Sequence, residues 1–375
     1  MRRKLPEMGF AFAPPQGGNH PLAITALRAW RMKEPVSGRR YTVVKLQSQG
    51  GDIGFGEGGP ASGLEIADAR AAVVGRRATE SEFIRARLNG SPALEAGVTN
   101  AMLDCVSRAK RVPIYQYLGG PTRFKARVLA QLEGTDEAST AAPLARAMKL
   151  GFQAFTMPVL QRDAMIPLQE YVDKVRKRVA AFQAKGGPTA EWVLDGAGEL
   201  TPGDAAMIAM ALEKNHLIWF DEPTSVQTTD ALAKIVDESV MPIGLGRKIT
   251  DIGTFQNLLR FGSVNVLRPS LGLNSLTKIK RMAAIAETHY VAVAPYHGGG
   301  PIGTVGGIHL AAALPNSFIQ EVPMPASDRD AAMRAELTSG NKEVADKGFA
   351  ALLNRPGLGF EVSEKALDAY SEERV

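Results

Sequence analysis

Three short apolar runs, evenly spaced along the chain, each end in residues that could do chemistry. The first run ends at Asp195, the second at Asp221 and Glu222, and the third at Arg247 and Lys248. Acidic side chains gathered at one point usually bind a divalent cation through their oxygens. The third cluster is basic instead, so the set combines two acidic ends with one cationic end.

The spacing of these clusters indicates how they are held. They lie about 26 residues apart, which leaves room for a strand, a loop and one helix, the repeating unit of a parallel sheet. Polar groups at the C-terminal ends of consecutive parallel strands converge at one mouth of a barrel. We therefore expect all three clusters to lie close together.

The same alternation of strand and helix continues over most of the chain. Apolar runs predict strands at 127–132, 152–157, 191–195, 217–220, 242–245, 264–267, 291–294 and 317–320. Helical patterns lie between them, near 137–149, 166–184, 203–215, 228–238, 251–261, 275–289 and 304–314. Eight consecutive units favour a closed (β/α)8 barrel, and a doubly wound open sheet is the alternative.

Segments before and after this alternation have a different pattern. Residues 1–125 read as an α+β domain, with a hairpin at 41–58 and helical periodicity at 64–88 and 92–110. The barrel then occupies 126–323. We expect residues 324–375, a helical and loop segment, to return to the first domain.

Composition restricts the class of protein and its partners. The chain has 375 residues, a net charge of +5 and one cysteine, Cys105. It has no long Lys/Arg run and no apolar run of about 18 residues, so we expect neither nucleic-acid binding nor a membrane span. The basic start, Met1 to Lys4, lacks the apolar stretch of a signal peptide. We expect a cytoplasmic homo-oligomer with an anionic small-molecule substrate.

Several motifs, taken in order, carry a family resemblance. They are Gly-Phe-Gly-Glu-Gly at 54–58, Trp-Phe-Asp-Glu-Pro at 219–223, Ala-Pro-Tyr-His at 294–297 and Pro-Gly-Leu-Gly at 356–359. Together they resemble the enolase superfamily, and within it the mandelate racemase and muconate lactonizing enzyme group. The resemblance covers nearly the whole chain. It implies a (β/α)8 TIM-type barrel with an N-terminal α+β capping domain, and an isomerase or lyase acting on a carboxylate or sugar acid.

The resemblance also implies a magnesium site, which this sequence matches only in part. Asp195 stands at the first ligand position, and Asp221 stands at the second, with Glu222 as its alternative. The third position is Arg247, a permanent donor that cannot ligate a hard cation. We therefore predict no firm cofactor and no tight three-carboxylate magnesium site, and Mg²⁺ only if the incomplete set still binds it. We expect Arg247 to reach both Asp195 and Asp221. The alternative for Asp195 is a cap on the following loop or helix.

The bases that the resemblance implies are missing. Thr156 and Pro158 stand where the family has a Lys-x-Lys pair, and Ser270 replaces an Asp on the sixth strand. Related sugar-acid dehydratases can carry a His where Ala197 stands. The candidates left for acid–base chemistry are Tyr296, His297, Lys248 and Glu321, and those for substrate binding are Arg247, Arg268, Thr156 and Ser270.

Two of these candidates have a simpler interpretation. His297 could bind a carbonyl of the glycine loop at 298–300, and Glu321 could pair with Arg247, Lys248 or Arg268. Two hypotheses therefore stay open. One is a diverged racemase or dehydratase, and the other is a non-catalytic pseudoenzyme or small-anion-binding protein on the same fold.

Overall fold

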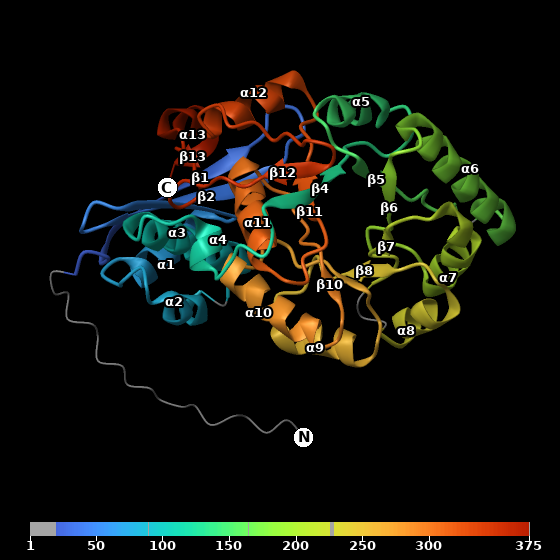
Figure 1. Ribbon diagram of the computed structural model, residues 1–375, viewed down its shortest axis with the longest axis horizontal. Coiled ribbons are helices and arrows are strands. Elements are labelled where there is room, and N and C mark those ends of the chain that lie inside the picture. The colour runs from blue at the N-terminus through green and yellow to red at the C-terminus, as the bar shows by residue number, and fades with distance from the viewer. Residues whose placement is uncertain (1–19, 89, 164, 226–228, 375) are drawn as a thin grey trace.

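The computed structural model describes residues 20–88, 90–163, 165–225 and 229–374, which form two sheets with helices around them (Figure 1). One sheet is a ring of parallel strands, and the other is a smaller antiparallel sheet beside it. The basic start, Met1 to Lys4, lies outside the described residues. Within the described part, no helix is both long enough and apolar enough to cross a membrane.

Eight parallel strands form the wall of the ring. They are β4 (Lys125–Gln131), β5 (Ala154–Pro158), β6 (Glu191–Asp195), β7 (Trp219–Asp221), β8 (Ile243–Leu245), β9 (Val266–Leu267), β10 (Ala292–Val293) and β11 (Gln320–Pro323). Consecutive strands from β4 to β10 are neighbours, and β11 pairs with β4. A bridge between Val293 and Ser317, just ahead of β11, joins the two ends of this row. The predicted closed barrel is therefore confirmed.

A helix follows each strand and covers the outside of the wall (Figure 1). The helices are α5 (Ala141–Lys149), α6 (Leu168–Gly186), α7 (Pro202–Ala211), α8 (Thr229–Glu238), α9 (Ile252–Arg260), α10 (Leu276–Glu287), α11 (Pro301–Ala313) and α12 (Asp328–Leu337), with a short 3-10 helix, η1 (Glu213–Asn215), after α7. Polar side chains begin several of them. Thr201 caps α7, and Asp251 caps α9 by accepting a hydrogen bond from the Thr254 amide.

The barrel core has an outer and an inner layer. In the outer layer, the ring of Trp192 on β6 lies 5.3 Å from Phe155 and 5.6 Å from Phe182 of α6. In the inner layer, Trp219 lies 5.9 Å from Phe318. All these side chains except Phe318 are buried, so they hold the strand ends that carry the polar clusters.

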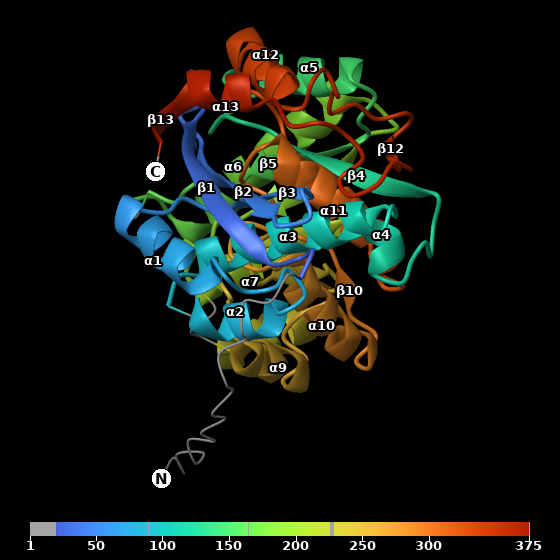
Figure 2. The same ribbon diagram turned by 90° about the vertical axis from the view of Figure 1, so that its left-hand side faces the viewer.

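The small sheet has the order β13-β1-β2-β3 and lies at the opposite end of the molecule from α6 (Figures 1 and 2). Its strands are β1 (Ile24–Lys33), β2 (Arg40–Ser48), β3 (Ile53–Gly58) and β13 (Ser371–Arg374). The accompanying helices are α1 (Gly63–Val73), α2 (Ser81–Arg87), α3 (Pro92–Ala109), α4 (Ile114–Tyr117) and α13 (Glu364–Tyr370). A further strand, β12 (Phe349–Ala351), runs antiparallel to β4. This is the α+β unit that the resemblance implies.

Close backbone contact joins the hairpin to α3. Gly54, Gly56 and Gly58 occupy alternate positions of β3 and face this helix. A methyl group added to Gly56 would lie 2.1 Å from the carbonyl oxygen of Gly97, and one added to Gly54 would lie 2.1 Å from that of Ala101. The glycines of the 54–58 motif are therefore needed because the strand lies directly on the helix backbone.

Candidate active site

Five charged side chains form one continuous row of ion pairs at the mouth of the barrel. Nη1 of Arg247 donates to Oδ2 of Asp195 at 3.0 Å, and its Nη2 contacts Oδ2 of Asp221. Nε of Arg268 donates to Oδ1 of Asp221 at 3.0 Å, and its Nη2 contacts Oε2 of Glu321. The expected bridge from Arg247 to both aspartates is confirmed, as is the alternative of an ion pair between Glu321 and Arg268.

Strand register explains this row. Asp195 and Asp221 are the last residues of β6 and β7 and pair directly in the sheet, so their carboxylates lie side by side. Burial opposes ionisation of Asp221, but the guanidinium groups of Arg247 and Arg268 hold the pKa of this carboxyl below its ordinary value. Asp221 and Asp195 likewise raise the pKa of Arg247 despite its burial. Asp221 and Arg247 therefore remain charged at neutral pH.

Two polar atoms in the row have no hydrogen-bond partner in the part of the chain that the structure describes. Among the described residues, no group hydrogen-bonds to Nε of Arg247 or to Oε1 of Glu321, although both atoms are buried. Burial and the neighbouring Asp221 raise the pKa of Glu321, whereas Arg268 and Arg247 lower it, and the net pKa lies above the ordinary value. An unpaired buried donor and acceptor indicate where a ligand would complete the site.

Tyr296 lies against the cations of this row. The guanidinium carbon of Arg247 lies 4.6 Å from the centre of the Tyr296 ring, and that of Arg268 lies 6.0 Å away. Burial and Glu321 raise the pKa of the Tyr296 hydroxyl above its usual value. Tyr296 is therefore protonated at neutral pH and can donate a proton.

Glu222 has a structural role beside the row. Its Oε1 accepts hydrogen bonds from the amide of Gly246 at 2.7 Å and from that of Arg247 at 2.9 Å. Its φ of 42° is unusual for a residue other than glycine. Glu222 therefore fixes the backbone that carries Arg247, and its Oε1 is engaged by that backbone.

Asp195 also supports its own loop. Its Oδ1 accepts a hydrogen bond from the Ala197 amide at 2.9 Å, while its Oδ2 pairs with Arg247. Ala197 has a φ of 54°, so the chain turns sharply at this point. The predicted local cap by Asp195 and its role in the charged cluster are thus both present.

The structure gives other candidates different surroundings. Arg268 is completely buried, and its nitrogens are engaged by Asp221, Glu321 and the Ala294 carbonyl, so direct substrate binding is replaced by a positioning role. The Thr156 hydroxyl accepts from the Leu132 amide at 3.0 Å. The Thr156 hydroxyl oxygen is therefore already engaged by a backbone amide.

Ser270 and Lys248 also lie outside the row of ion pairs. The hydroxyl of Ser270 accepts from the Gly272 amide at 3.2 Å, and Ser270 bridges Tyr296 in the sheet. Lys248 is exposed beside Arg247. Lys248 is therefore the candidate that an incoming anion can reach from solvent.

His297 belongs to the contact with the small sheet. Its Nε2 lies 2.7 Å from the carbonyl oxygen of Gly300 and 3.8 Å from Oε1 of Glu57. The predicted carbonyl partner in the glycine loop is confirmed. Burial lowers the pKa of His297 to about 4, so the ring is neutral at pH 7. These partners give His297 a structural role in place of the predicted catalytic one.

Glu57 was not identified by sequence reasoning. Its two oxygens accept hydrogen bonds from the amides of Gly300 at 2.6 Å and Gly303 at 3.0 Å, at the start of α11. Burial raises the pKa of this carboxyl to about 7. The only local signal was a charged residue between two glycines of the 54–58 motif.

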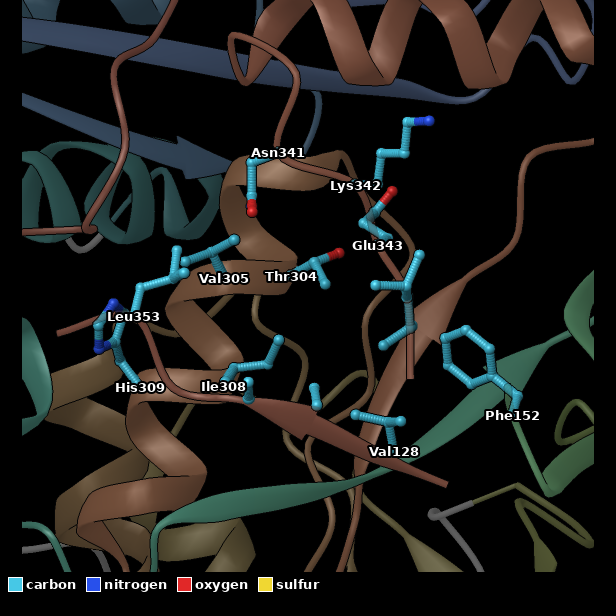
Figure 3. Close-up of a pocket in the computed structure, with 14 residues that line it drawn as sticks. Val128, Phe152, Thr304, Val305, Ile308, His309, Asn341, Lys342, Glu343 and Leu353 are labelled. Atoms are coloured by element: carbon cyan, nitrogen blue, oxygen red, sulfur yellow. The ribbon is translucent and has the colours of Figure 1, made fainter. Parts of the chain in front are cut away.

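One apolar cavity lies away from the row of ion pairs. A cavity of about 120 Å³ lies between β4, α11 and residues 341–353 (Figure 3). Its wall is mainly apolar, with side chains such as Val128, Phe152 and Ile308, and its Glu343 is already paired with Arg334. The chemistry-bearing groups therefore lie at the barrel mouth and not in this cavity.

Comparison with known proteins identifies the family. The family described as Enolase C-terminal domain-like matches residues 139–366, more than half of the chain. The chain belongs to the enolase superfamily. Its fold is similar to that of a mandelate racemase/muconate lactonizing enzyme-like protein from Roseovarius, with a TM-score of 0.82 and 22% identity over 93% of this chain and 96% of that one. A similar protein from Rubrobacter xylanophilus has a TM-score of 0.81 and 23% identity, over 94% of this chain and 98% of that one.

Curated relatives of this enolase superfamily member have named activities. A D-galactonate dehydratase from Verminephrobacter eiseniae is 28% identical, covering 72% of this chain and 71% of the relative. Another from Pectobacterium atrosepticum is 25% identical, covering 92% of this chain and 93% of the relative. The similarity therefore extends over both the barrel and the small sheet.

The residues of this superfamily member do not fit the magnesium ion that the family implies. Arg247 lies between Asp195 and Asp221 and pairs with both. Within the described ranges, no group of three or more His, Cys, Asp or Glu side chains could hold a metal ion. Magnesium requires near-octahedral oxygen ligands, and a guanidinium at the third position supplies none.

Proposed function

We propose that this protein is an isomerase or lyase, of the racemase or dehydratase type, acting on a small carboxylic acid such as a sugar acid. The relatives named D-galactonate dehydratase support this substrate class, because one of them aligns with nearly the whole chain. The proposed ligand is anionic. Lys248 is exposed beside Arg247, and Nε of Arg247 has no hydrogen-bond partner among the described residues.

The observation that carries the proposal is the position of Tyr296 against Arg247, close to Glu321. Removal of a proton next to a carboxylate needs a proton-transfer group and positive charge near the developing enediolate. Arg247 provides the positive charge. Oε1 of Glu321, which has no hydrogen-bond partner among the described residues, can accept the proton, and burial raises the pKa of this carboxyl. The Tyr296 hydroxyl, which is protonated at neutral pH, can then donate a proton back to the enediolate.

Proton exchange in heavy water tests this function. The purified protein is incubated with sugar acids that include D-galactonate, and NMR follows the hydrogen next to the carboxylate. Loss of that signal, or appearance of a keto product, is the expected result. Binding of an acid without exchange would instead favour the small-anion-binding alternative, and neither binding nor exchange with any acid would overturn both.

We also propose a cellular location and an oligomeric state for the protein. We infer a cytoplasmic protein, since the single cysteine, Cys105, is buried and free. We infer a homo-oligomer because Phe124 and Tyr290 are 88% and 100% exposed, each just ahead of a barrel strand. Light scattering on the purified protein would measure the assembly, and a monomer at micromolar concentration would contradict it.

A further inference from the structure

We infer that Arg247 has replaced the divalent cation, so that the site binds its ligand's carboxylate on a guanidinium held by Asp195 and Asp221. The inference rests on the proposed function for the nature of the ligand. The absence of a metal requirement rests on the ion pairs alone. It can therefore be tested without knowing the substrate.

Arg247 provides the counter-charge for Asp195 and Asp221. Asp195 and Asp221 end adjacent parallel strands, and each gives one oxygen to a different nitrogen of Arg247. A guanidinium that pairs with two carboxylates in this way neutralises both and fixes their positions. A cation between these strand ends would have to displace Arg247.

A second guanidinium group, that of Arg268, lies beside Asp221. Arg268 is completely buried on the other side of Asp221, with its Nε 3.0 Å from Oδ1. A divalent cation near Asp221 would thus face two guanidinium groups. Each unit of positive charge at contact distance lowers cation affinity by about a hundredfold or more in a partly buried site.

Glu222 is not free to serve as a substitute metal ligand. Glu222 is the nearest other carboxylate in the sequence, but its Oε1 holds the amides of Gly246 and Arg247. Turning Glu222 toward a metal would release the loop that positions Arg247. The incomplete acidic set therefore cannot be completed at low cost.

The carboxylate of the bound acid would hydrogen-bond to Nε of Arg247. The centre of the Tyr296 ring lies 4.6 Å from the guanidinium carbon of Arg247. Nε of Arg247 is buried and unpaired within the described part of the chain. A carboxylate oxygen would complete its hydrogen bonding and bring the neighbouring carbon close to Tyr296.

Calorimetric titration of the purified full chain with MgCl₂ tests the inference directly. We expect no saturable heat at micromolar to low millimolar magnesium, and no magnesium in elemental analysis. We also expect the same melting temperature with magnesium and with EDTA. Stoichiometric binding at micromolar magnesium, or a melting temperature lowered by EDTA, would overturn the inference.

A gain-of-binding variant sharpens this test. Arg247→Glu restores a carboxylate at the third position, so magnesium should raise its melting temperature and bind at least about tenfold more tightly than to the unaltered protein. Lys248→Glu is the matched control, because it makes the same charge change one residue away and should gain no such site. Equal gains in both variants would contradict the role of Arg247. If Arg247→Glu fails to fold even with magnesium, the titration of the unaltered protein still decides.

The two proposals fail in different ways. Proton exchange that EDTA abolishes would retain the proposed function and overturn the inference. A protein that binds no magnesium and exchanges no proton with any acid would retain the absence of metal and overturn the function. Exchange that survives EDTA in the unaltered protein and disappears in Arg247→Gln is the outcome that supports both.

Discussion

Arg268 donates through Nε to both carboxylate oxygens of Asp221, at 3.0 and 3.1 Å, and neither side chain is exposed to solvent. The remaining nitrogens of Arg268 reach Glu321 and the Ala294 carbonyl. The charge of Arg268 is thus part of the barrel core. Removing one member of such a set leaves other charges buried without a partner.

The first prediction is that Arg268→Met lowers the free energy of unfolding by about 3–5 kcal/mol, because Glu321 loses its partner and Asp221 keeps only Arg247. Chemical denaturation followed by circular dichroism measures this change. Lys248→Met is the control, since Lys248 is exposed and should change the free energy by less than about 0.5 kcal/mol. A similar small change in both variants would contradict the ion-pair row.

The second prediction concerns the contact between β3 and α3. Gly56→Ala should lower the free energy of unfolding by at least about 2 kcal/mol, because the added methyl group would overlap the carbonyl oxygen of Gly97. Gly203→Ala in α7 is the matched control. Nothing lies within 4 Å of its added carbon, so this change should be neutral or stabilising by up to about 1 kcal/mol. Urea denaturation of both variants measures the difference.

The third prediction concerns Glu57, whose pKa burial raises from 4.5 to about 7. The folded protein binds more protons here than the unfolded chain does, so this carboxyl's contribution to stability is complete below pH 4.5 and is lost as pH rises through about 7. The loss amounts to about 3 kcal/mol in all. Glu57→Gln removes it.

Denaturation of the Glu57→Gln variant at several pH values measures this contribution. Relative to the variant, the unaltered protein should lose stability between pH 4.5 and 7. The surrounding charged groups, Arg334, Glu343 and His297, are present in both proteins, so the difference between the two curves reports the Glu57 carboxyl together with its interactions with these groups. Parallel curves for the two proteins would show that Glu57 titrates normally.

The fourth prediction concerns His309, whose contribution to stability is lost as pH falls, whereas that of Glu57 is lost as pH rises. Burial lowers the pKa of His309 from 6.5 to about 4, and its ring stacks on Tyr115 at 5.7 Å. The folded state keeps this ring neutral, so its contribution is complete above pH 6.5 and is lost as pH falls through about 4. His309→Gln should remove that acid-dependent loss. His289→Gln, in the exposed segment after α10, is the matched control for losing one imidazole.

The fifth prediction concerns catalysis. Tyr296→Phe keeps the ring against Arg247 but removes the hydroxyl, so proton exchange should fall by about a hundredfold or more while binding of the acid persists. NMR exchange rates and calorimetric affinities on the same variant separate the two effects. Unchanged exchange would assign the proton transfer to another group.

Much of the barrel could be predicted from the sequence because its units are local. The strand predicted at 191–195 agrees with β6 of the barrel, and the hairpin predicted at 41–58 agrees with β2 and β3 of the small sheet. Other strands depend on distant partners. The predicted strands at 264–267 and 291–294 are only two residues long as β9 and β10, since apolar composition does not reveal where ladder pairing stops.

Non-local contacts explain what was missed in the small sheet. β1 was not identified, and its charged residues Arg28 and Lys33 pair with Glu364 and Glu372 near the other end of the chain. The single helical pattern at 64–88 is two helices, because the chain turns at Gly75, with a φ of 86°. Neither feature has a strong local signal.

In the candidate site, too, some contacts could be predicted from the sequence and others could not. The bridge from Arg247 to Asp195 and Asp221 could be predicted, because all three residues follow regularly spaced strands. Glu57 could not, because its partners are the amides of Gly300 and Gly303, which only the folded chain brings near it. Burial of Arg268 likewise depends on closure of the whole barrel.

The pairing of β13 with β1 has a consequence for synthesis of the protein. During translation, β1, β2 and β3 leave the ribosome before the barrel, whereas β13 is made after it. The nascent small sheet therefore presents an open strand edge throughout synthesis of the barrel. Such an edge is prone to pair with other chains, so chaperones that shield it during translation would raise the yield of folded protein.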